Sequence, residues 1–397
     1  MTNTKPCTVV AAALAAALKT VRPFTGKTEP ILAMTHMAVS DGLLRVSNTC
    51  LDVMATAIVP CEGDMPAFAV DGRKLAALLR NYPAGEAVAL LPDLGNAVLR
   101  IRAQDEEFRI EVLRQDEWPK MTRPQSADVH GSIQVDAGFV GDVFGRLLPF
   151  VSTEETRYYL NGINLQSDGD HIVAASTDGH RLGRIRRAAA GAEAFLKAGP
   201  ESCIIRRRAI VAAVALLRGP VTIHLSKHRI EMSCPVGVVT STLIDGTFPA
   251  YGKLIPDHGA CGYEADRKAL LSAVAKLSAV SDGQDGMSLA WDGRQLVGEV
   301  TIGVHGIGGR VPVSGSGALT TWPKTSLGIS RRYLASIASV LRGAALQITA
   351  GAQRHAPFVI SDPSDSDVLF LLMSMTVDAA KRHVAPSAQV GTLEAAE

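Results

Sequence analysis

The 397-residue sequence lacks the features that mark most metal sites, membrane spans and disulfide-stapled folds. Its six cysteines fall in no C-x-x-C or other ligand-like spacing, which argues against a zinc site or disulfide framework. No apolar stretch approaches the roughly 20 residues needed to cross a bilayer. The formal net charge is only +1, which excludes a bulk polycation but not a local concentration of positive charge. We therefore expect a cytoplasmic globular protein with no metal or cofactor.

Signals for secretion and for a nucleotide-binding loop are weak. An apolar run from Val9 to Leu18 follows Lys5 as in a signal peptide, but it is mostly alanine and continues amphipathically to Val21, which favours a helix. The glycine-rich run 303–317 lacks the strand and helix that flank a dinucleotide-binding glycine loop. The sequence therefore indicates neither a secreted protein nor a dinucleotide-binding protein.

One unit of sequence occurs more than once. Residues 29–56 and 156–183 share an outline in which a Ser-Asp-Gly turn separates two alternating apolar runs, as in a strand hairpin. A repeat of this length is a whole small domain, and 397 residues suit about three domains of ordinary size. The chain is predicted to consist of a few similar globular modules laid end to end.

Apolar stripes place two helices in each third of the chain. Their spacing is that of one buried helix face, and short apolar runs between and after them, punctuated by Gly, Asp and Ser, indicate antiparallel strands. The predicted fold class is therefore α+β, with two helices on antiparallel sheet in each of three repeated domains. The first-helix stripes are Val10, Leu14, Leu18 and Val21; Phe139, Val143, Leu147 and Phe150; and Leu270, Val274 and Leu277. The second-helix stripes are Leu75, Leu78, Leu79 and Tyr82; Ile210, Ala213, Val214 and Leu217; and Leu334, Ile337, Ala338 and Leu341.

Two proline-containing segments mark the predicted domain boundaries. Trp118 precedes Pro119, and Phe248 precedes Pro249, in stretches of turn-like composition. These segments divide the chain into domain 1 at 1–125, domain 2 at 126–256 and domain 3 at 257–377. The polar, unpatterned residues 378–397 are expected to form a flexible tail.

Arginine recurs at one position of the second helix in all three domains. Arg73, Arg208 and Arg332 occupy the same slot in the first turn, where the helix dipole disfavours cations. A solvated helix end explains any one of them, but threefold recurrence indicates a polyanion held by phosphate contacts. No base-reading motif accompanies them, so binding independent of nucleotide sequence is expected. Lys74, Arg206, Arg207 and Arg331 add charge in the same turn, and Arg80 adds charge near the far end of the helix in the first domain.

The segment 156–183 carries a more specific signal. Its YYLNG (158–162) and TDGHRL (177–182) resemble the middle domain of bacterial DNA polymerase III beta subunits, the sliding clamps. The residues LIDGTFPAY (243–251) resemble the second linker of that family, and FLLMSM (370–375) resembles its C-terminal strand. The resemblance extends over 8–377 and is strongest in the second domain.

The resemblance implies a ring. Two chains of three domains would close head to tail around duplex DNA, with twelve helices lining the hole. A closed ring converts weak, salt-sensitive phosphate contacts into a topological tether that still permits sliding. The resemblance places Lys27, Arg73, Lys74, Arg80, Tyr158, Tyr159, Arg206 and Arg207 toward DNA, and the helix slot adds Arg208 and Arg332.

The resemblance also implies an apolar pocket for short peptides of the replicative polymerase, the clamp loader and repair proteins. Leucine and methionine would form a deformable wall suited to several related peptides. Two departures affect this pocket, since Ser374 and Thr376 stand where the family usually has proline and arginine, and a tail follows. The matching positions are Leu160, Thr177, Gly179, His180, Arg181, Leu182, Pro249, Leu254, Leu372, Met373, Ser374 and Met375.

Ring closure would also require apolar residues between chains. Phe108 and Ile110, in the run FRIEVL, are the candidates at the edge of the first domain, and Leu277 and Val280 are those in the third domain. Core packing within one chain is the alternative for all four. No contact to a membrane is expected.

The sequence leaves two alternative functions to consider, an enzyme and an accessory clamp. Asp178, His180 and Arg181 could form an acid–base and anion-binding cluster, but no nucleophile elbow or metal-ligand spacing accompanies them, so no enzyme is expected. The departures at Ser374 and Thr376 allow an accessory or drug-tolerant clamp with altered partners.

Overall fold

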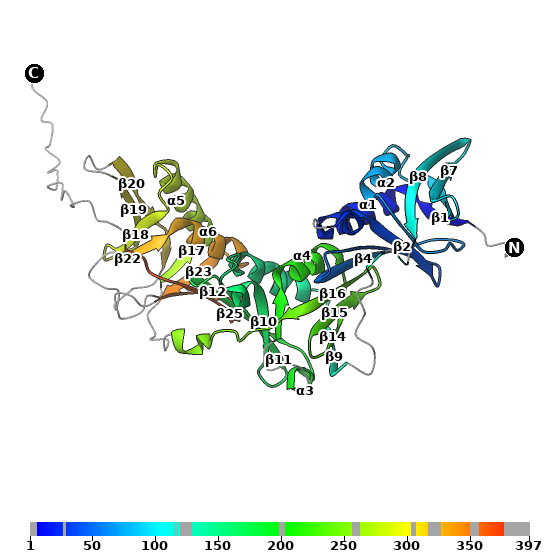
Figure 1. Ribbon diagram of the computed structural model, residues 1–397. Coiled ribbons are helices and arrows are strands. Elements are labelled where there is room, and N and C mark those ends of the chain that lie inside the picture. Colours follow the sequence, from blue (N-terminus) through cyan, green and yellow to red (C-terminus); the bar gives the residue numbers. More distant parts are fainter. Residues whose placement is uncertain are drawn as a thin grey trace, which may run out of the picture. The chain divides into compact units, whose positions relative to one another are not determined.

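The computed structural model describes residues 6–26, 29–114, 116, 118–119, 129–197, 203–255, 263–302, 307–316, 327–349 and 357–376. The chain divides into two compact units, Met1–Ala250 and Tyr251–Glu397 (Figure 1). Across those ranges, no helix combines the length and apolar character of a membrane span. The predicted boundaries at 125/126 and 256/257 stay a prediction.

The first unit begins with eight strands and two helices. In bonding order the strands are β1 (Cys7–Val10), β6 (Ala87–Asp93), β7 (Val98–Ala103), β8 (Glu106–Arg114), β5 (Phe68–Val70), β2 (Thr35–Ser40), β3 (Leu43–Thr49) and β4 (Val53–Pro60), all antiparallel. Helix α1 (Ala11–Val21) runs into the 3-10 turn η1 (Arg22–Phe24), and η2 (Pro30–Ala33) precedes β2. Helix α2 (Gly72–Leu79) packs against α1.

The same pattern follows in the second half of this unit. Strand β9 (Gly131–Val135) pairs with β14 (Val221–Leu225) as β1 pairs with β6, and β10 (Gly162–Ser167) pairs with β13 (Cys203–Arg206) as β2 pairs with β5. The remaining strands are β11 (His171–Thr177), β12 (Arg181–Ala188), β15 (Arg229–Cys234) and β16 (Gly237–Ile244). The helical elements are η5 (Val140–Gly145), η6 (Leu148–Phe150), η7 (Tyr158–Leu160), α3 (Ala192–Lys197), α4 (Arg207–Leu216) and η8 (Tyr251–Leu254), the last of which opens the second unit.

The two halves of the first unit are joined by a continuous sheet. Strand β4 pairs antiparallel with β16 from Val53↔Ser241 to Ala57↔Gly237. Helix α4 packs on both of these strands, so one layer of helices covers the seam. The two halves therefore share main-chain hydrogen bonds as well as side-chain contacts.

The second unit repeats the topology once more. Strand β17 (Tyr263–Asp266) pairs with β23 (Ala345–Thr349), and β18 (Gly286–Trp291) pairs with β22 (Leu327–Ser330), the positions taken by β1–β6 and β2–β5. The other elements are α5 (Arg267–Ala279), β19 (Leu296–Ile302), β20 (Ile307–Val313), β21 (Gly315–Ser316), α6 (Arg331–Val340), β24 (Phe358–Asp362) and β25 (Asp365–Leu372). The predicted α+β class with one topology used three times is confirmed.

Most residues of the predicted helix stripes are buried, but two of the first helices differ from the prediction, and the second-helix stripes run past the ends of α2, α4 and α6. Val10 is the last residue of β1 and is 42% exposed, so the helix starts at Ala11 and its buried face begins there. The first helix of the second repeat is not a regular α-helix: it contains the π-helical segment Val140–Gly145 and ends in a 3-10 turn at Pro149, although Phe139, Val143, Leu147 and Phe150 are all buried. A proline in the interior of a helix removes a backbone hydrogen bond, which accounts for the early end.

Candidate nucleic-acid interface

The first turn of α2 is basic but already compensated. The Asp71 carboxylate caps the helix by accepting hydrogen bonds from the backbone N–H groups of Arg73 (2.9 Å) and Lys74 (3.2 Å). It also lies 3.9 Å from Arg73 Nε, whose side chain is 71% exposed. An exposed pair of this kind contributes little stability, so the Arg73 guanidinium can turn to an external anion at small cost. Lys74 and Arg80 are also exposed.

Three consecutive arginines at the junction of β13 and α4 make different contacts. Arg206 Nε donates to Thr242 Oγ1 at 2.8 Å, and its Nη2 lies 3.5 Å from the Asp52 carboxylate of the first repeat. Arg208 Nη2 donates to the carbonyl oxygens of two residues after α1, Pro23 and Thr25. Arg206 and Arg208 therefore join the two repeats.

Arg207 and the tyrosine turn form the exposed part of this site. The Arg207 N–H donates to the Asn161 carbonyl oxygen at 2.9 Å, which places η7 beside the first turn of α4. Within η7, Tyr158 is 54% exposed and meets Tyr159 edge to face, with ring centroids 5.9 Å apart. The structure thus brings together two tyrosines and an arginine that were all predicted to face DNA. Lys27 lies outside the described residues.

Neighbouring arginines of α6 have opposite environments. Arg331 is 4% exposed and donates to the carbonyl oxygens of Leu277 (2.8 Å) and Asp285 (3.2 Å), so the expectation that it adds surface charge is wrong. Burial lowers the pKa of Arg331, and Asp285 opposes that shift. Arg332 has a 78% exposed side chain, with Nε 3.4 Å from Asp285 Oδ2.

The Asp285 carboxylate holds the start of α6. Desolvation acts to raise the pKa of Asp285, but hydrogen bonds from Ser330 Oγ and the Arg332 N–H, together with the Arg332 charge, outweigh it and lower the pKa. Ser330 Oγ in turn accepts a hydrogen bond from the Tyr333 N–H. The helix is thus capped internally, as α2 is.

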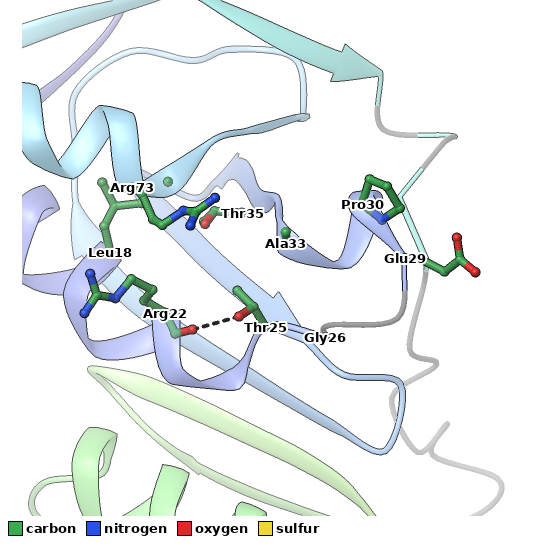
Figure 2. A pocket seen from close by; sticks show the side chains of 10 residues that line it. Leu18, Arg22, Thr25, Gly26, Glu29, Pro30, Ala33, Thr35 and Arg73 are labelled. Atoms are coloured by element: carbon green, nitrogen blue, oxygen red, sulfur yellow. Dashed lines mark hydrogen bonds between the residues drawn. The ribbon is translucent and has the colours of Figure 1, made fainter.

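A cavity of about 490 Å³ lies beside α2 in the first unit (Figure 2). Arg22 and Arg73 are on one side of it, and Pro30 and Glu29 on the other. Thr25 Oγ1 donates to the Arg22 carbonyl oxygen at 3.1 Å and shapes the turn between them. The remaining lining residues are Leu18, Gly26, Ala33, Thr35 and Gly72.

The predicted peptide-pocket residues of the first unit cluster around one tight turn. Asp178 Oδ1 accepts hydrogen bonds from the N–H groups of His180 (3.0 Å) and Arg181 (3.1 Å), while Oδ2 accepts one from Arg181 Nε at 3.0 Å. Gly179 has φ +91°, a conformation that favours glycine. This carboxylate is engaged in holding the turn, which explains Asp178 without catalysis.

Other predicted pocket residues divide by exposure. Arg181 also donates to the Pro149 carbonyl oxygen and lies 4.9 Å over the Phe150 ring, so its guanidinium is largely committed. Leu160, Thr177 and Leu182 are buried, and His180 and Pro249 are exposed. In the second unit Leu372 is buried, Met373 and Ser374 are half-buried, and Leu254 (50%) and Met375 (42%) are exposed. The Met375 N–H donates to the Gly328 carbonyl oxygen at 2.8 Å.

The four residues predicted to form the dimer interface differ in their exposure. Phe108 is 40% exposed, Ile110 is half-buried, and Val280 is 41% exposed. Leu277 is only 1% exposed, so it belongs to the core of its own unit and is corrected as an interface residue. Helix spacing could not distinguish Leu277 from Val280, because the two positions lie at one helix end.

Sequence reasoning missed three features of the site. Arg22 directly follows the first helix stripe. It does not lie at the recurring position of the second helix that identified Arg73, so the repeat pattern did not single it out. Asp71 precedes a helix, a recognisable capping signal. Asp285 acts on α6 from 45 positions away, and no local pattern reveals it. Within the described ranges, no cluster of three His, Cys, Asp or Glu side chains could hold a metal ion.

Comparisons with known proteins give one answer. Residues 143–250 match the family model of the DNA polymerase III beta subunit, central domain. The beta sliding clamp of Caulobacter vibrioides is 26% identical over 381 residues, covering 93% of this chain and 99% of that protein. That of Escherichia coli K12 is 25% identical over 270 residues, covering 66% and 70%. The resemblance to bacterial DNA polymerase III beta subunits is therefore confirmed.

Solved structures agree with the sequence relatives. The sliding clamp of Bartonella birtlesii bound to griselimycin has a TM-score of 0.81 at 25% identity, covering 94% of this chain and 100% of that one. A Pseudomonas aeruginosa sliding clamp with ligand has a TM-score of 0.81 at 20% identity, with the same coverage. The chain has the sliding-clamp fold.

Proposed function

We propose that this chain is a DNA sliding clamp, which encircles duplex DNA and tethers a replicative polymerase without catalysing a reaction. The observation that carries the proposal is the match to the Caulobacter vibrioides beta sliding clamp over 93% of this chain and 99% of that protein. Three copies of one topology in the chain support it, because a ring around a helical polymer is naturally built from repeated modules.

DNA would be held by enclosure and weak charge contacts. Contacts to backbone phosphate carry no sequence information and weaken steeply with salt, so they allow movement along the duplex. The exposed members of the predicted set suit this role: Arg73, Lys74, Arg80, Tyr158, Arg207 and Arg332. Arg208 is better assigned to holding the two repeats together, because its guanidinium already bonds two carbonyl oxygens.

The proposed ring is a homodimer closed through two sheet edges. Along residues 106–111, β8 pairs with β7, and its other edge carries no strand within the described chain. Phe108 and Ile110 extend an apolar face to this edge, on the side of the buried Ile101. Strand β20 ends the four-stranded sheet of the second unit, next to exposed Val280. Two such edges can join by main-chain hydrogen bonds.

Short peptides of polymerase, clamp loader and repair proteins are the proposed partners of the predicted pocket residues. Exposed Leu254, Met375 and His180 offer the apolar and polar contacts that such peptides need. Three domains bounded near residues 125 and 256, a location in the cytoplasm at the nucleoid, and the absence of catalysis are parts of the same proposal.

The function is tested by loading the protein on circular primed DNA and scoring retention before and after the circle is cut. Dimerisation is tested separately by sedimentation of the double variant Phe108→Ser, Ile110→Ser. We expect a monomer, because the apolar face would be lost. An unchanged dimer would refute the assigned edge.

A further inference from the structure

The cavity between α1, η2 and α2 has a chemistry that enclosure of duplex DNA does not require. We propose that it binds a single nucleotide, with the phosphate between Arg22 and Arg73 and the nucleoside toward Pro30 and Glu29 (Figure 2). This site goes beyond the proposed clamp function and does not depend on encirclement.

Two arginines at the cavity can serve a phosphate once Arg22, whose guanidinium points away from the other lining residues in Figure 2, turns toward Arg73. Arg22 is exposed, and its side chain makes no hydrogen bond or ion pair with any residue the structure describes. Arg73 has only the 3.9 Å contact with Asp71, at 71% exposure. Arginine matches phosphate oxygens with paired N–H donors, so both side chains can turn to the ligand without losing a strong partner.

The opposite side of the cavity suits the rest of a nucleotide. Leu18, Pro30 and Ala33 supply apolar surface for a sugar or base. In Figure 2 the exposed Glu29 carboxylate projects away from the other lining residues; turned toward the cavity, it can accept hydrogen bonds from base or sugar groups and would repel a purely anionic ligand. A molecule with one anionic end and one hydrogen-bonding end therefore fits better than inorganic phosphate.

The walls of the cavity are held before any ligand arrives. Gly72 approaches Thr35 so closely that an added Cβ would lie 2.2 Å from Thr35 Oγ1. Gly26 donates its N–H to the Thr49 carbonyl oxygen at 2.9 Å, and Arg208 holds the Pro23–Thr25 segment. The volume of about 490 Å³ lies within the range of roughly 300 to 1,000 Å³ typical of small-molecule sites.

A nucleotide could reach this site from two sources. A free mononucleotide and the unpaired end of a DNA strand present the same phosphate and nucleoside. The duplex backbone itself presents paired bases that cannot enter a cavity. The site is therefore assigned to an unpaired nucleotide, free or at a strand end.

Calorimetric titration of the full chain tests the proposal with three probes: thymidine 5′-monophosphate, inorganic phosphate and a short 5′-phosphorylated oligothymidylate. Arg22→Gln and Arg73→Gln should each weaken binding of the monophosphate by about tenfold, the effect of losing one charge-assisted contact. Lys19→Gln is the matched control, because Lys19 is an exposed cation in the last turn of α1, three residues before Arg22, but does not line the cavity. Glu29→Gln should lower affinity for the monophosphate relative to phosphate.

Each outcome decides the proposal. Binding of the monophosphate alone supports a free nucleotide as the source, and tighter, Arg22-dependent binding of the oligonucleotide supports a strand end. No binding of the monophosphate, equal binding of inorganic phosphate, or indifference to Arg22→Gln and Arg73→Gln would overturn it. Failure of retention on circular DNA would leave these titrations unaffected.

Discussion

Arg208 donates a hydrogen bond from Nη2 to the carbonyl oxygen of Thr25, 2.9 Å away and 183 positions earlier in the chain. The same nitrogen lies 3.1 Å from the Pro23 carbonyl oxygen. The guanidinium thus ties the first turn of α4 to the segment that follows α1. A residue in the recurring arginine slot serves here as a link between repeats.

Arg208→Ala should therefore affect stability more than DNA binding. Loss of two charge-assisted hydrogen bonds at an exposed site is expected to cost about 1 kcal/mol in the free energy of unfolding, measured by urea titration. The matched control is Arg207→Ala, since Arg207 is exposed and its side chain has no partner among the described residues. Arg207→Ala should leave stability unchanged and weaken duplex binding at low salt. The reverse pattern would show that the two roles are misassigned.

Gly72→Ala should destabilise the first unit by about 1 to 3 kcal/mol, the cost of forcing extra volume into a packed site. The new methyl group would lie 2.2 Å from Thr35 Oγ1 and 3.0 Å from Thr35 Cβ, so α2 must move away from β2. Gly85→Ala is the control, because nothing lies within 4 Å of its added Cβ. Equal unfolding midpoints for the two variants in a thermal scan would contradict this packing.

Substitution of adjacent arginines in α6 should have opposite consequences. Arg331→Ala removes the hydrogen bonds from a buried guanidinium to the carbonyl oxygens of Leu277 and Asp285 and leaves a cavity, so it should cost about 2 to 4 kcal/mol. Arg332→Ala removes an exposed pair and should cost at most about 1 kcal/mol, while lowering duplex affinity. Urea unfolding and a salt titration of duplex binding measure the two effects. A larger stability loss for Arg332→Ala would be inconsistent with the buried role of Arg331.

Alkaline pH should weaken the fold through buried thiols. Desolvation raises the pKa of Cys203 to about 12 in the folded protein, and burial beside Cys61 raises that of Cys7 to about 12. Above about pH 9 the unfolded chain loses these protons and the folded chain keeps them, so stability falls as pH rises from 9 toward 12. The slope should approach ~1.4 kcal/mol per pH unit for each thiol.

Cys203→Ala tests that slope. Unfolding free energies measured from pH 8 to pH 10.5 should fall less steeply in the variant than in the parent chain, because one titrating thiol is gone. Parallel curves would mean that Cys203 does not titrate differently in the two states.

The helices were predictable because their stability comes from one buried face. The last residues of three stripes, Val21, Leu277 and Leu341, are each at most 2% exposed. Val10 was misplaced because an apolar residue at a helix boundary has the same spacing whether it ends a strand or starts a helix. The repeated outline around Ser40 and Ser167 fell on two equivalent hairpins, β2–β3 and β10–β11.

The site was predictable only where local sequence determines it. The tyrosine turn and the first turns of the second helices follow from residues within a few positions of each other. The partners that assign Arg208 and Arg331 to structural roles lie 183 and 54 positions away, at Thr25 and Leu277. Arginine slots alone therefore could not separate DNA-facing side chains from buried or bridging ones.

Encirclement is tested most directly by loading the protein on nicked circular DNA and measuring the bound fraction before and after a single restriction cut. The clamp account predicts retention on the intact circle in salt that abolishes binding to linear fragments, followed by loss from the cut ends. Equal retention on circular and linear DNA would contradict it, because binding would then depend on contact affinity and not on a closed ring.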